Sequence, residues 1–521
     1  MVWQPEIEEL EHRKSLAMRM GGEERIARQH SEGKLTVRER VDTLLDPGTF
    51  FEIGELAGYG EYDEDRTLTG FTPSPYVTGL GRVNGQLVVV GGEDFTIRGG
   101  TAAGPARRRP KNNKWADSFA LRFGVPLIYM ADGAGASVRG VQYDQGGHLP
   151  SSDDFNSEVE LLGKVPVVAA IVGSVAGRPA GRAMMAHWTV MAKGSSQIFP
   201  GGPPVVRRAI SEEIDKETLG GSHVHVHRSG AVHNEAENEE DLFAQVRRYL
   251  SYMPPNVWEM APHVTPTDDP NRRSEELLGI IPRNTRRGYD MRKLIELVVD
   301  KDSFFEIRPH WGQTAITGLA RVNGYVVGVA ANDPRHLAGA IDTDGANKQT
   351  HFLDVCDTFN IPIVLFNDVP GFMVGSQAEL QGTIRHGMRT LMANAQLTVP
   401  VIQIHVRKAF GLAAAATGSS VPVHLRLGWP SGDWGSIPVE GGVEAAYRRD
   451  IAASPDSDAR RAELEDMMNK YRSPFLVAEA FDIEKMIDPR DTRPFLSMLV
   501  EAAQSPLKRN LGPKPKYGVR P

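Results

Sequence analysis

Short runs of continuous apolar residues alternate along the chain with longer stretches of mixed polar and apolar character. The runs are Leu87–Val90, Pro126–Met130 and Val165–Val172 in the first half, and Val326–Val329, Pro362–Phe366 and Val399–Val406 in the second. Runs of this length, separated by segments long enough for a helix, are typical of parallel strands buried on both faces. The pattern predicts an α/β fold built on parallel sheets, with ligands at the carboxyl ends of the strands.

The same pattern occurs twice, at an offset that drifts slowly along the chain. FFEI at residues 50–53 returns at 304–307, and TGLGRVNG at 78–85 returns as TGLARVNG at 317–324. GVPLIYMADGAG (124–135) then parallels NIPIVLFNDVPG (360–371), which places Asp132 over Asp368, and KVPVVAAIVGSVAGRPAG (164–181) parallels TVPVIQIHVRKAFGLAAA (398–415). Ordered matches of this kind indicate an internal duplication of a unit of roughly two hundred residues.

A chain of 521 residues is too long for one hydrophobic core, so at least two domains are expected. The Pro-rich stretch MPPNVWEMAPHVTPTDDP (253–270) separates the halves and is typical of a linker. We therefore predict an N-terminal domain at 1–255, a linker at 256–272 and a C-terminal domain at 273–521. The first forty residues are highly charged with a helical pattern, which indicates a packing arm rather than a catalytic element.

Composition narrows the class of protein. Apolar content of 40%, charged content of 24% and a net charge of −7 fit a soluble protein and argue against a general nucleic-acid binder. The single cysteine, Cys356, cannot form an intrachain disulfide, which fits a reducing compartment. No run of eighteen apolar residues occurs, and the start of the sequence has no apolar core of the signal-peptide type. We therefore expect a cytoplasmic protein that binds neither nucleic acid nor membrane.

The third apolar run of each half leads into a segment rich in Gly and Ala, VGSVAGRPAGRAMM (172–185) and RKAFGLAAAATGSS (407–420). Small residues at a strand-to-helix turn let a ligand approach the backbone, where the first N–H groups of the helix lack intrahelical partners. Two such amides aimed at one point make an oxyanion hole. Small residues also permit tight helix–sheet packing, but their recurrence at Gly177–Arg178 and Gly411–Leu412 favours function.

Five segments carry a resemblance to a known family: EDFTIRGG (93–100), NIPIVLFNDVPGFMVG (360–375), IRHG (384–387), TVPVIQIHVRKAFG (398–411) and WP…GGVEAA (429–446). They resemble the carboxyltransferase β subunits of biotin-dependent acyl-CoA carboxylases, of which propionyl-CoA and methylcrotonyl-CoA carboxylases are the best-known members. The resemblance implies two tandem crotonase-like (ClpP/crotonase spiral) domains from the duplication. It also implies a homo-hexamer, a trimer of dimers, in which the N-terminal domain of one subunit faces the C-terminal domain of another.

The resemblance implies an activity as well. Carboxybiotin, carried by a biotin carboxylase or biotin carboxyl carrier partner, supplies CO2, which the enolate of an acyl-CoA attacks from its α or vinylogous γ carbon. Negative charge develops on the ureido oxygen of biotin and on the thioester oxygen, and each oxygen needs backbone donors. No side-chain base is obligatory, which fits the lack of a convincing triad or metal-ligand set in the sequence.

Site residues follow from the same resemblance, with the N-terminal half holding acyl-CoA and the C-terminal half holding biotin. Gly177 and Arg178 would serve the first side, and Gly411, Leu412 and Ala413 the second. The other substrate-binding candidates are Arg98, Gly99, Gly100, Gly133, Ala134, Gly135 and Ala415. The biotin-side candidates are Asp368, Pro370, Gly371 and Phe372.

The chain departs from the family at several of these positions. Relatives usually carry Gly-Gly at Gly177–Arg178, which Pro179 follows here, and Gly-Gly-Ala at 411–413. After Asp132 the chain reads GAGASVRGV (133–141), without the usual Arg and Gln-Glu. The bulk of Arg178 near the thioester must change the acyl pocket, so we expect an altered substrate. An acidic residue is common in relatives at Ala415, and its absence indicates either a larger, more apolar acyl chain or neutral drift.

Three other motifs are weaker. SHVHVH (222–227) would place His223, His225 and His227 on one side of an extended segment, but no carboxylate or Cys spacing supports a metal site. The basic run ARRRPKNNK (106–114) fits either contact with CoA phosphates or a solvated face. GGEDFTIRGG has no GxGxxG pattern, which argues against a dinucleotide site.

Three hypotheses of function stay open on the sequence alone. The leading one is the carboxyltransferase subunit, which needs a separate biotinylated partner because the chain has no MKM-type biotinyl-lysine segment. The second is a biotin-independent enzyme that decarboxylates or otherwise processes a CoA thioester. The third is a degenerate paralogue that acts as a scaffold in a carboxylase complex.

Overall fold

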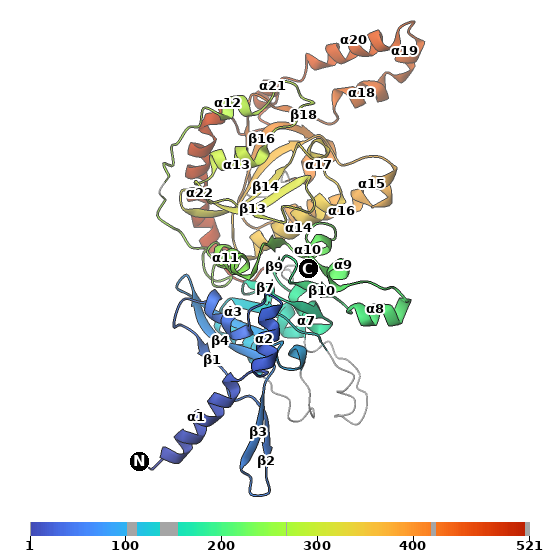
Figure 1. Cartoon of the computed structure of the whole chain (residues 1–521). Coiled ribbons are helices and arrows are strands. Elements are labelled where there is room, and N and C mark those ends of the chain that lie inside the picture. The colour runs from blue at the N-terminus through green and yellow to red at the C-terminus, as the bar shows by residue number, and fades with distance from the viewer. Residues whose placement is uncertain (1, 102–111, 136–154, 267, 418–423, 516–521) are drawn as a thin grey trace. The chain divides into compact units, whose positions relative to one another are not determined.

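The computed structural model describes residues 2–101, 112–135, 155–266, 268–417 and 424–515 (Figure 1). These residues fold into two compact units. Unit 1 comprises Met1–Glu259 with Gly512–Pro521, and unit 2 comprises Met260–Leu511. Among the described residues, no helix combines the length and the apolar character that a membrane crossing requires.

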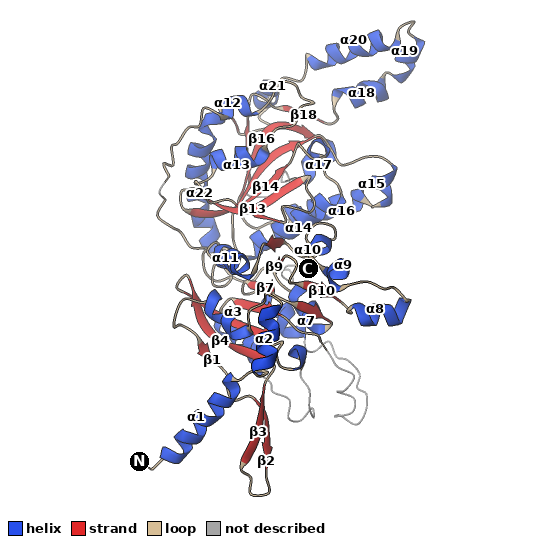
Figure 2. Cartoon of the chain, viewed as in Figure 1, coloured by secondary structure: helices blue, strands red, loops and turns tan. Residues whose placement is uncertain are grey.

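Unit 1 contains a mixed sheet, and Figure 2 draws its strands in red. The order of the strands is β1-β4-β5-β6-β7-β9-β11. Its strands are β1 (Phe51–Glu52), β4 (Tyr76–Val83), β5 (Gln86–Glu93), β6 (Leu127–Ala131), β7 (Val167–Ile171), β9 (Trp188–Ala192) and β11 (Asn234–Ala236). β1, β4 and β5 pair antiparallel, whereas β5 to β11 run parallel. Two small ladders join β2 (Gly58–Tyr62) to β3 (Leu68–Pro73) and β8 (Ser174–Ala176) to β10 (Gln197–Phe199).

Helices surround this sheet in the described part of unit 1. They are α1 (Gln4–Met18), α2 (Glu23–Ser31), α3 (Val37–Leu44), η1 (Arg98–Gly100), α4 (Asn112–Phe123), α6 (Asn156–Leu161), α7 (Arg178–Met184), α8 (Pro203–Ile210), α9 (Lys216–Gly220), α10 (Ser222–His225) and α11 (Glu239–Leu250). The start of α3 is fixed by a capping box between Thr36 and Glu39, as its Thr-x-x-Glu sequence favours. Its apolar residues Val37, Val41 and Leu44 are buried.

Unit 2 repeats this arrangement with a sheet in the order β12-β13-β14-β15-β16-β17-β19. Its strands are β12 (Phe305–Ile307), β13 (Ala315–Val322), β14 (Tyr325–Asn332), β15 (Ile363–Val369), β16 (Val401–Phe410), β17 (His424–Gly428) and β19 (Lys485–Met486), with β18 (Asp433–Gly435) paired to the end of β16. β12 to β14 pair antiparallel, and β14 to β19 run parallel.

The helices of unit 2 include a projecting arm. The helices are α12 (Leu277–Ile280), α13 (Met291–Val298), η4 (Leu337–Gly339), α14 (Thr343–Thr358), α15 (Ser376–Leu380), α16 (Thr383–Ala395), α17 (Gly411–Ala416), α18 (Val439–Ala446), α19 (Arg448–Ala453), α20 (Ser457–Asn469), α21 (Pro474–Glu479), η5 (Pro489–Asp491) and α22 (Thr492–Arg509). In Figure 1, α18 to α20 extend away from the sheet of unit 2. They have a small apolar cluster of their own, formed by Val443, Ile451 and Leu464.

The repeated octapeptide is an antiparallel hairpin. TGLGRVNG ends in the turn between β4 and β5, and TGLARVNG in the turn between β13 and β14. Asn84 and Gly85 have φ values of 52° and 80°, and Asn323 and Gly324 have 51° and 77°. Two successive residues with positive φ make the tight turn that Asn-Gly favours. The runs predicted to form parallel strands are β5 to β7 and β14 to β16, and they do pair in parallel; the antiparallel strands β4 and β13 were not predicted.

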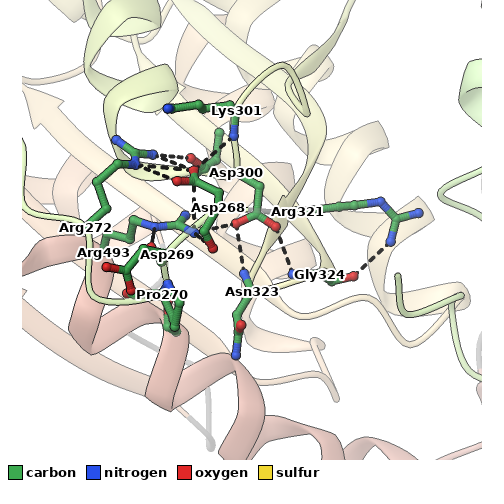
Figure 3. Close-up of polar contacts among 12 residues, drawn as sticks. Asp268, Asp269, Pro270, Arg272, Asp300, Lys301, Arg321, Asn323, Gly324 and Arg493 are labelled. Carbon is green, nitrogen blue, oxygen red and sulfur yellow. Dashed lines mark hydrogen bonds and ion pairs between the residues drawn. The ribbon is translucent and has the colours of Figure 1, made fainter. Parts of the chain in front are cut away.

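An aspartate holds each hairpin turn in place. In unit 2, Asp300 accepts hydrogen bonds from the N–H groups of Asn323 (3.0 Å) and Gly324 (2.8 Å), and it pairs with Arg493 of α22 at 2.8 Å (Figure 3). In unit 1, Asp46 accepts from the corresponding Asn84 and Gly85 N–H groups at 3.1 and 2.8 Å. The duplication thus repeats the local hydrogen bonds as well as the sequence.

Candidate active site

In unit 1, three backbone segments meet at the ends of parallel strands: η1, the turn after β6, and the turn from β8 into α7. The N–H of Ala134 donates to the carbonyl of Gly99, and the N–H of Ala176 donates to the carbonyl of Gly133, both at 2.9 Å. Gly135 lies against the backbone of Gly177. The structure therefore gathers the N-terminal candidates Arg98, Gly99, Gly100, Gly133, Ala134, Gly135 and Gly177 in one place.

Two glycines allow these segments to approach so closely. A Cβ on Gly100 would lie 2.9 Å from the carbonyl oxygen of Asp132, and a Cβ on Gly135 would lie 2.6 Å from that of Ala176. Both glycines also have positive φ, 71° and 77°. A side chain at either position would push the segments apart and strain the backbone.

Helix α7 starts at Arg178, directly after Gly177, whose φ of 66° turns the chain from β8 into the helix. The first N–H groups of a helix have no acceptor within it, and Pro179 contributes no N–H. In this first turn the amides of Arg178 and Ala180 are therefore the donors that the backbone can offer to an oxyanion. A change of side chain at position 178 leaves its amide in place.

The side chain of Arg178 lies against α6. Its guanidinium bonds to Glu158 at 3.1 Å and lies over the ring of Phe155, 5.0 Å from the centroid. It also lines a polar cavity of about 130 Å³, whose other lining residues are Asn113, Lys114, Asp117, Ser118, Ser157 and Arg182. The guanidinium therefore has contacts of its own, which the sequence did not indicate.

Each unit places a polar side chain beside the residue at the end of the second parallel strand. This side chain also lies close to a short 3-10 helix, η1 in unit 1 and η4 in unit 2. In unit 1, Glu93 accepts from the N–H of Asp132 (3.3 Å) and from the hydroxyl of Tyr129 (2.6 Å). Burial raises the pKa of Glu93. In unit 2, Asn332 accepts from the N–H of Asp368 and donates to the carbonyl of Gly339, both at 3.3 Å. Neither Glu93 nor Asn332 is among the site residues predicted from the sequence.

Asp132 is fully buried, and arginine from the N-terminal arm compensates its charge. Arg40 of α3 bonds to Asp132 at 2.8 Å, to Glu239 at 2.8 Å and to the carbonyl of Val172 at 2.8 Å. Burial opposes the charge on Arg40, but the two carboxylates raise its pKa overall. The N-terminal arm, which was predicted to be a packing element, thus also supplies the cation that pairs with a buried carboxylate. A charged residue within the buried face of α3 was the available signal.

In unit 2, the turn from β16 into α17 has the same form. Gly411 has a φ of 57°, and a Cβ there would lie 2.8 Å from the carbonyl oxygen of Ser436. Leu412 is 48% exposed, whereas Ala413 is buried. The first-turn amides of α17 follow directly on the end of a parallel strand, as those of α7 do.

The predicted biotin-side residues lie beside this turn. The N–H of Ile341 donates to the carbonyl of Gly371 at 3.1 Å, and Phe372 packs in one apolar cluster with Ala413 and Ala414. The ring of Phe372 lies against Gly387 of α16, where a Cβ would overlap with it. The structure therefore places Asp368, Pro370, Gly371 and Phe372, at the end of β15 and just after it, next to Ala413 of α17.

Asp368 is also fully buried and paired with an arginine. Arg407 of β16 bonds to it at 2.9 Å, and the N–H of Lys408 donates to its other oxygen at 3.1 Å. The Arg407 guanidinium lies over the ring of Tyr289, 4.8 Å from the centroid. Ala415, one helical turn after Gly411 in α17, lines a separate cavity of unit 2.

A second cavity of unit 1 adjoins η1. It measures about 220 Å³ and is lined by Arg25, Arg28, Gln29, Glu32, Phe95, Thr96, Arg98 and Gly99. Three arginines face one glutamate there, so an anion with several charges would be favoured. Arg98 itself has a positive φ of 53°.

Several predicted features take other forms or cannot be placed. SHVHVH is not extended, since Ser222–His225 form α10 and His225 bonds to the carbonyl of Ile198 at 2.8 Å. The extended segment that would have placed His223, His225 and His227 on one side is therefore not formed. Residues 106–111 of the basic run, together with Ser137 and Arg139, lie outside the described residues.

Comparisons with known proteins agree with this arrangement. Residues 28–515 match the carboxyl transferase domain family. The chain is 35% identical to the propionyl-CoA carboxylase carboxyltransferase subunit of Haloferax mediterranei over 100% of both chains, and 33% identical to the methylmalonyl-CoA decarboxylase subunit alpha of Veillonella parvula over 99% of both. It superimposes on the transcarboxylase 12S structure, described as a hexamer with methylmalonyl-CoA and methylmalonic acid bound, with a TM-score of 0.87 at 31% identity and 96% coverage of each chain.

These matches settle the fold and the family. The duplicated, two-domain crotonase-like fold expected from the sequence is confirmed. The resemblance first carried by five short segments extends over nearly the whole chain. The chain belongs to the carboxyl transferase domain family.

Proposed function

We propose that this chain is a carboxyltransferase subunit that transfers the carboxyl group of carboxybiotin, carried on a partner protein, to an acyl-CoA. One observation carries the proposal. In a chain of the carboxyl transferase family, both units present the same strand-to-helix turn, at Gly177 and at Gly411, beside a buried carboxylate and a glycine-rich turn. Enolate formation and biotin release each need an oxyanion site, and two such turns supply them.

Unit 1 fits the acyl-CoA side. The N–H groups of the first turn of α7 would donate hydrogen bonds to the thioester oxygen as negative charge develops on it, which lowers the barrier to removal of the α-proton. The arginine-lined cavity beside Gly99 suits the phosphates of coenzyme A, because guanidinium groups bind phosphate with paired hydrogen bonds. In this division the acyl-CoA domain spans 1–255, the linker 256–272 and the biotin domain 273–521.

Unit 2 fits the biotin side. Carboxybiotin would supply the CO2, and the biotin anion that remains after release of CO2 would supply the base. The small residues at Gly411 and Ala413 leave the backbone amides of α17 accessible, and the ring of Phe372 forms an apolar wall beside them. Backbone N–H groups bind the ureido oxygen more strongly as it becomes an anion, and this favours release of CO2. A side chain at Gly411 would close this approach.

The proposal includes partners and an assembly. The chain requires a biotin carboxylase or biotin carboxyl carrier subunit for net carboxylation. We expect a homo-hexamer, a trimer of dimers, in the cytoplasm, with the turn of unit 1 in one subunit facing the turn of unit 2 in another. The resemblance to the hexameric transcarboxylase 12S, at 96% coverage, supports this assembly.

The test is carboxylation of an acyl-CoA panel with and without a biotinylated partner. The purified chain is incubated with the partner, ATP, labelled bicarbonate and acetyl-, propionyl-, methylcrotonyl- or longer acyl-CoA, and label in acid-stable product is counted. We expect incorporation that requires the partner and that avidin abolishes. Incorporation should depend strongly on the acyl group, since Arg178 and Ala415 both depart from the usual family residues.

Two other results would contradict the proposal. Thioester turnover or decarboxylation that persists without biotin and in the presence of avidin would indicate a biotin-independent enzyme. A complex that forms with the partner but carboxylates no acyl-CoA would indicate a scaffold. Mass photometry of the purified chain tests the hexamer separately.

A further inference from the structure

Glu93, the last residue of β5, packs against the glycine-rich turns of unit 1 from the side of the sheet. It is 8% exposed. A Cβ on Gly133 would lie 3.0 Å from the Cγ of Glu93, and a Cβ on Gly100 would lie 3.0 Å from its Cβ. The two glycines therefore leave the space that the Glu93 side chain fills, and this side chain supports both turns at once.

A path of backbone hydrogen bonds connects Glu93 to the start of α7. Its carboxyl accepts from the N–H of Asp132 at 3.3 Å. The carbonyl of Gly133, the next residue, accepts from the N–H of Ala176 at 2.9 Å. Helix α7 begins two residues after Ala176, at Arg178. The hydrogen bond at Glu93 therefore fixes the first step of a short path that ends at the first amide of α7.

A second connection runs through side chains. The hydroxyl of Tyr129 in β6 donates to Glu93 at 2.6 Å, and the guanidinium of Arg182 lies over the Tyr129 ring, 4.5 Å from its centroid. Asp117 of α4 bonds to Arg182 at 2.6 Å. All four side chains are more than nine-tenths buried. Because Arg182 lies in α7, one helical turn after Arg178, the helix is anchored at a second point.

Unit 2 keeps only the first of these connections. Asn332 aligns with Glu93 and accepts from the N–H of Asp368 at 3.3 Å, as Glu93 does from Asp132. The other three members of the network are replaced by buried apolar residues. Tyr129, Asp117 and Arg182 align with Leu365, Leu353 and Ala416. Burying polar and charged groups is costly unless they are paired, so unit 1 has a need for this network that unit 2 does not share.

The first turns of the two helices show what that need is. In α7 the second residue is Pro179, which has no N–H to donate. In α17 every residue of the segment Gly411–Ala416 has a backbone N–H. Fewer donors remain in α7, and hydrogen bonds weaken steeply as their angle departs from linear. The direction in which α7 points is therefore more critical, and anchoring at two points fixes it.

We propose that Glu93 is a positioning residue of the acyl-CoA side, which aims the first amides of α7 at the thioester oxygen through Asp132 and through Tyr129. This inference rests on the function proposed above for unit 1. Glu93 acts here through its hydrogen bonds and not as a base. Burial raises the pKa of its carboxyl, which favours the neutral form, and its counterpart Asn332 is an uncharged amide.

A chromophoric thioester tests this proposal without biotin or a partner protein. The probe is 4-dimethylaminocinnamoyl-CoA, whose absorbance shifts to longer wavelength when its thioester oxygen accepts hydrogen bonds. We expect the probe to show this red shift when it binds to the native full-length protein. Glu93→Ala removes both hydrogen bonds, so the bound probe should lose most of the red shift. In the carboxylation assay, kcat should fall by about 10- to 100-fold with little change in KM, as expected when donors are misplaced.

Two further variants separate positioning from general damage. In Glu93→Gln the amide oxygen can still accept from the N–H of Asp132, and its NH2 group can donate to the Tyr129 oxygen, so the red shift and kcat should return close to native values. Tyr129→Phe keeps the ring beneath Arg182 and removes only the hydroxyl, so its red shift should be intermediate. Both variants nearly conserve side-chain volume, which keeps the test decisive if Glu93→Ala fails to fold.

The matched control is Asn332→Ala, which removes the equivalent hydrogen bond in unit 2. It should leave the red shift of the bound thioester in place. An equal loss of red shift in Asn332→Ala and Glu93→Ala would overturn the proposal, because the effect would not be confined to the acyl-CoA side.

The remaining outcomes are distinct. A native red shift in Glu93→Ala, or a loss in Glu93→Gln as large as in Glu93→Ala, would overturn the proposal. A native protein that leaves the spectrum of the probe unchanged would overturn it as well. If the red shifts follow the expected order but no acyl-CoA is carboxylated, the proposed function alone fails. If the native protein carboxylates an acyl-CoA and the Glu93 variants match it in rate and red shift, the positioning role alone fails.

Discussion

The two units keep the same buried carboxylate but compensate its charge from different elements. Asp132 and Asp368 occupy equivalent positions, and both are 0% exposed. In unit 1 the partner is Arg40, from a helix of the N-terminal arm, whereas in unit 2 it is Arg407, from the neighbouring strand. A buried charge without a partner is costly, so the carboxylate requires an arginine, but not one from a fixed position.

The position that holds the arginine in one unit holds a different residue in the other. Arg407 aligns with Gly173, and Arg40 aligns with Leu294 of α13. Where unit 2 has the arginine, unit 1 has a glycine, and the Asp132 carboxylate lies so close to Gly173 that a Cβ there would overlap with it. The two units therefore supply the arginine from different elements, and each has a glycine or leucine at the position where the other has its arginine. The difference shows that the site needs the carboxylate, and that its surroundings adapt to it.

The largest predicted effect is on stability and comes from Arg40→Leu, which gives unit 1 the residue of unit 2. Asp132 and Glu239 would both remain buried without their cation. We expect a loss of about 3–5 kcal/mol in the free energy of unfolding, measured from urea-induced unfolding. Arg13→Leu, which removes an exposed pair with Glu9, is the control and should cost less than about 1 kcal/mol.

The double variant Arg40→Leu/Gly173→Arg sharpens the comparison. It copies the arrangement of unit 2, so the new arginine should recover part of the loss once the Asp132 side chain turns away from position 173. We expect only partial recovery of the free energy of unfolding, because Glu239 would remain buried without a cation. If the effects of the two substitutions on stability are additive instead, an arginine at position 173 does not replace Arg40 as the partner of Asp132.

Features set by local sequence could be predicted, whereas contacts between residues far apart in the sequence could not. Strand and turn patterns are local, so the duplication, the strands and the glycine-rich turns at Gly177 and Gly411 could be predicted from the sequence. The antiparallel hairpin was missed although Asn-Gly marked its turn, because continuous apolar strands do not distinguish parallel from antiparallel pairing. Arg40 could not be assigned, since its partners lie about 92 and 199 residues away in sequence.

The second prediction compares the glycines of the two turns. Gly411→Val adds strain at positive φ and brings a Cβ 2.8 Å from the carbonyl of Ser436. Among the described residues, a Cβ on Gly177 would have only the Cα of Gly135 near it, at 3.9 Å. We expect Gly411→Val to lower the rate of carboxyl transfer by about 10²–10³, as loss of an oxyanion donor does. Gly177→Ala should cost less. Rates are measured with saturating partner and acyl-CoA.

A control separates this effect from unfolding. Gly279 lies in α12, and no atom of the described residues comes within 4 Å of an added Cβ, so Gly279→Val should leave the rate unchanged. Circular dichroism and the melting temperature of all variants are compared alongside. Normal transfer by Gly411→Val would rule out the placement of the oxyanion site at α17.

The third prediction concerns pH and the exchange of Ile171 for His405 between the units. Burial lowers the pKa of His405 from 6.5 to about 4. Between these values the unfolded chain binds a proton that the folded chain does not, so stability is present above pH 6.5 and falls as the pH drops toward 4. His405→Ile should remove this contribution, which makes the variant more stable than the native protein at pH 4 by about 2–3 kcal/mol relative to pH 7.

His187 of unit 1 provides the internal comparison. Burial lowers its pKa to about 4 as well, and it bonds to the N–H of Val167 and the carbonyl of Leu162 at 3.0 and 2.9 Å. Its acid-dependent loss should persist in His405→Ile. Urea unfolding midpoints at pH 4, 5, 6 and 7 measure both. Parallel pH profiles of the variant and the native protein would mean that folding does not lower the pKa of His405.

The smallest effect is expected at the residues that follow the two turn glycines. Arg178→Gly and Leu412→Gly each introduce the glycine that the family resemblance led us to expect, without removing a backbone amide. The Arg178 side chain is 38% exposed, so loss of its pair with Glu158 should cost at most about 1 kcal/mol of stability. Transfer rates should stay within about tenfold, because the backbone donor is retained.

The informative quantity is the acyl preference. Arg178→Gly should change the ratio of kcat/KM between short and long acyl-CoA, whereas Leu412→Gly, on the biotin side, should leave that ratio unchanged. Equal shifts in both variants would mean that the two turns do not divide acyl-CoA and biotin between them.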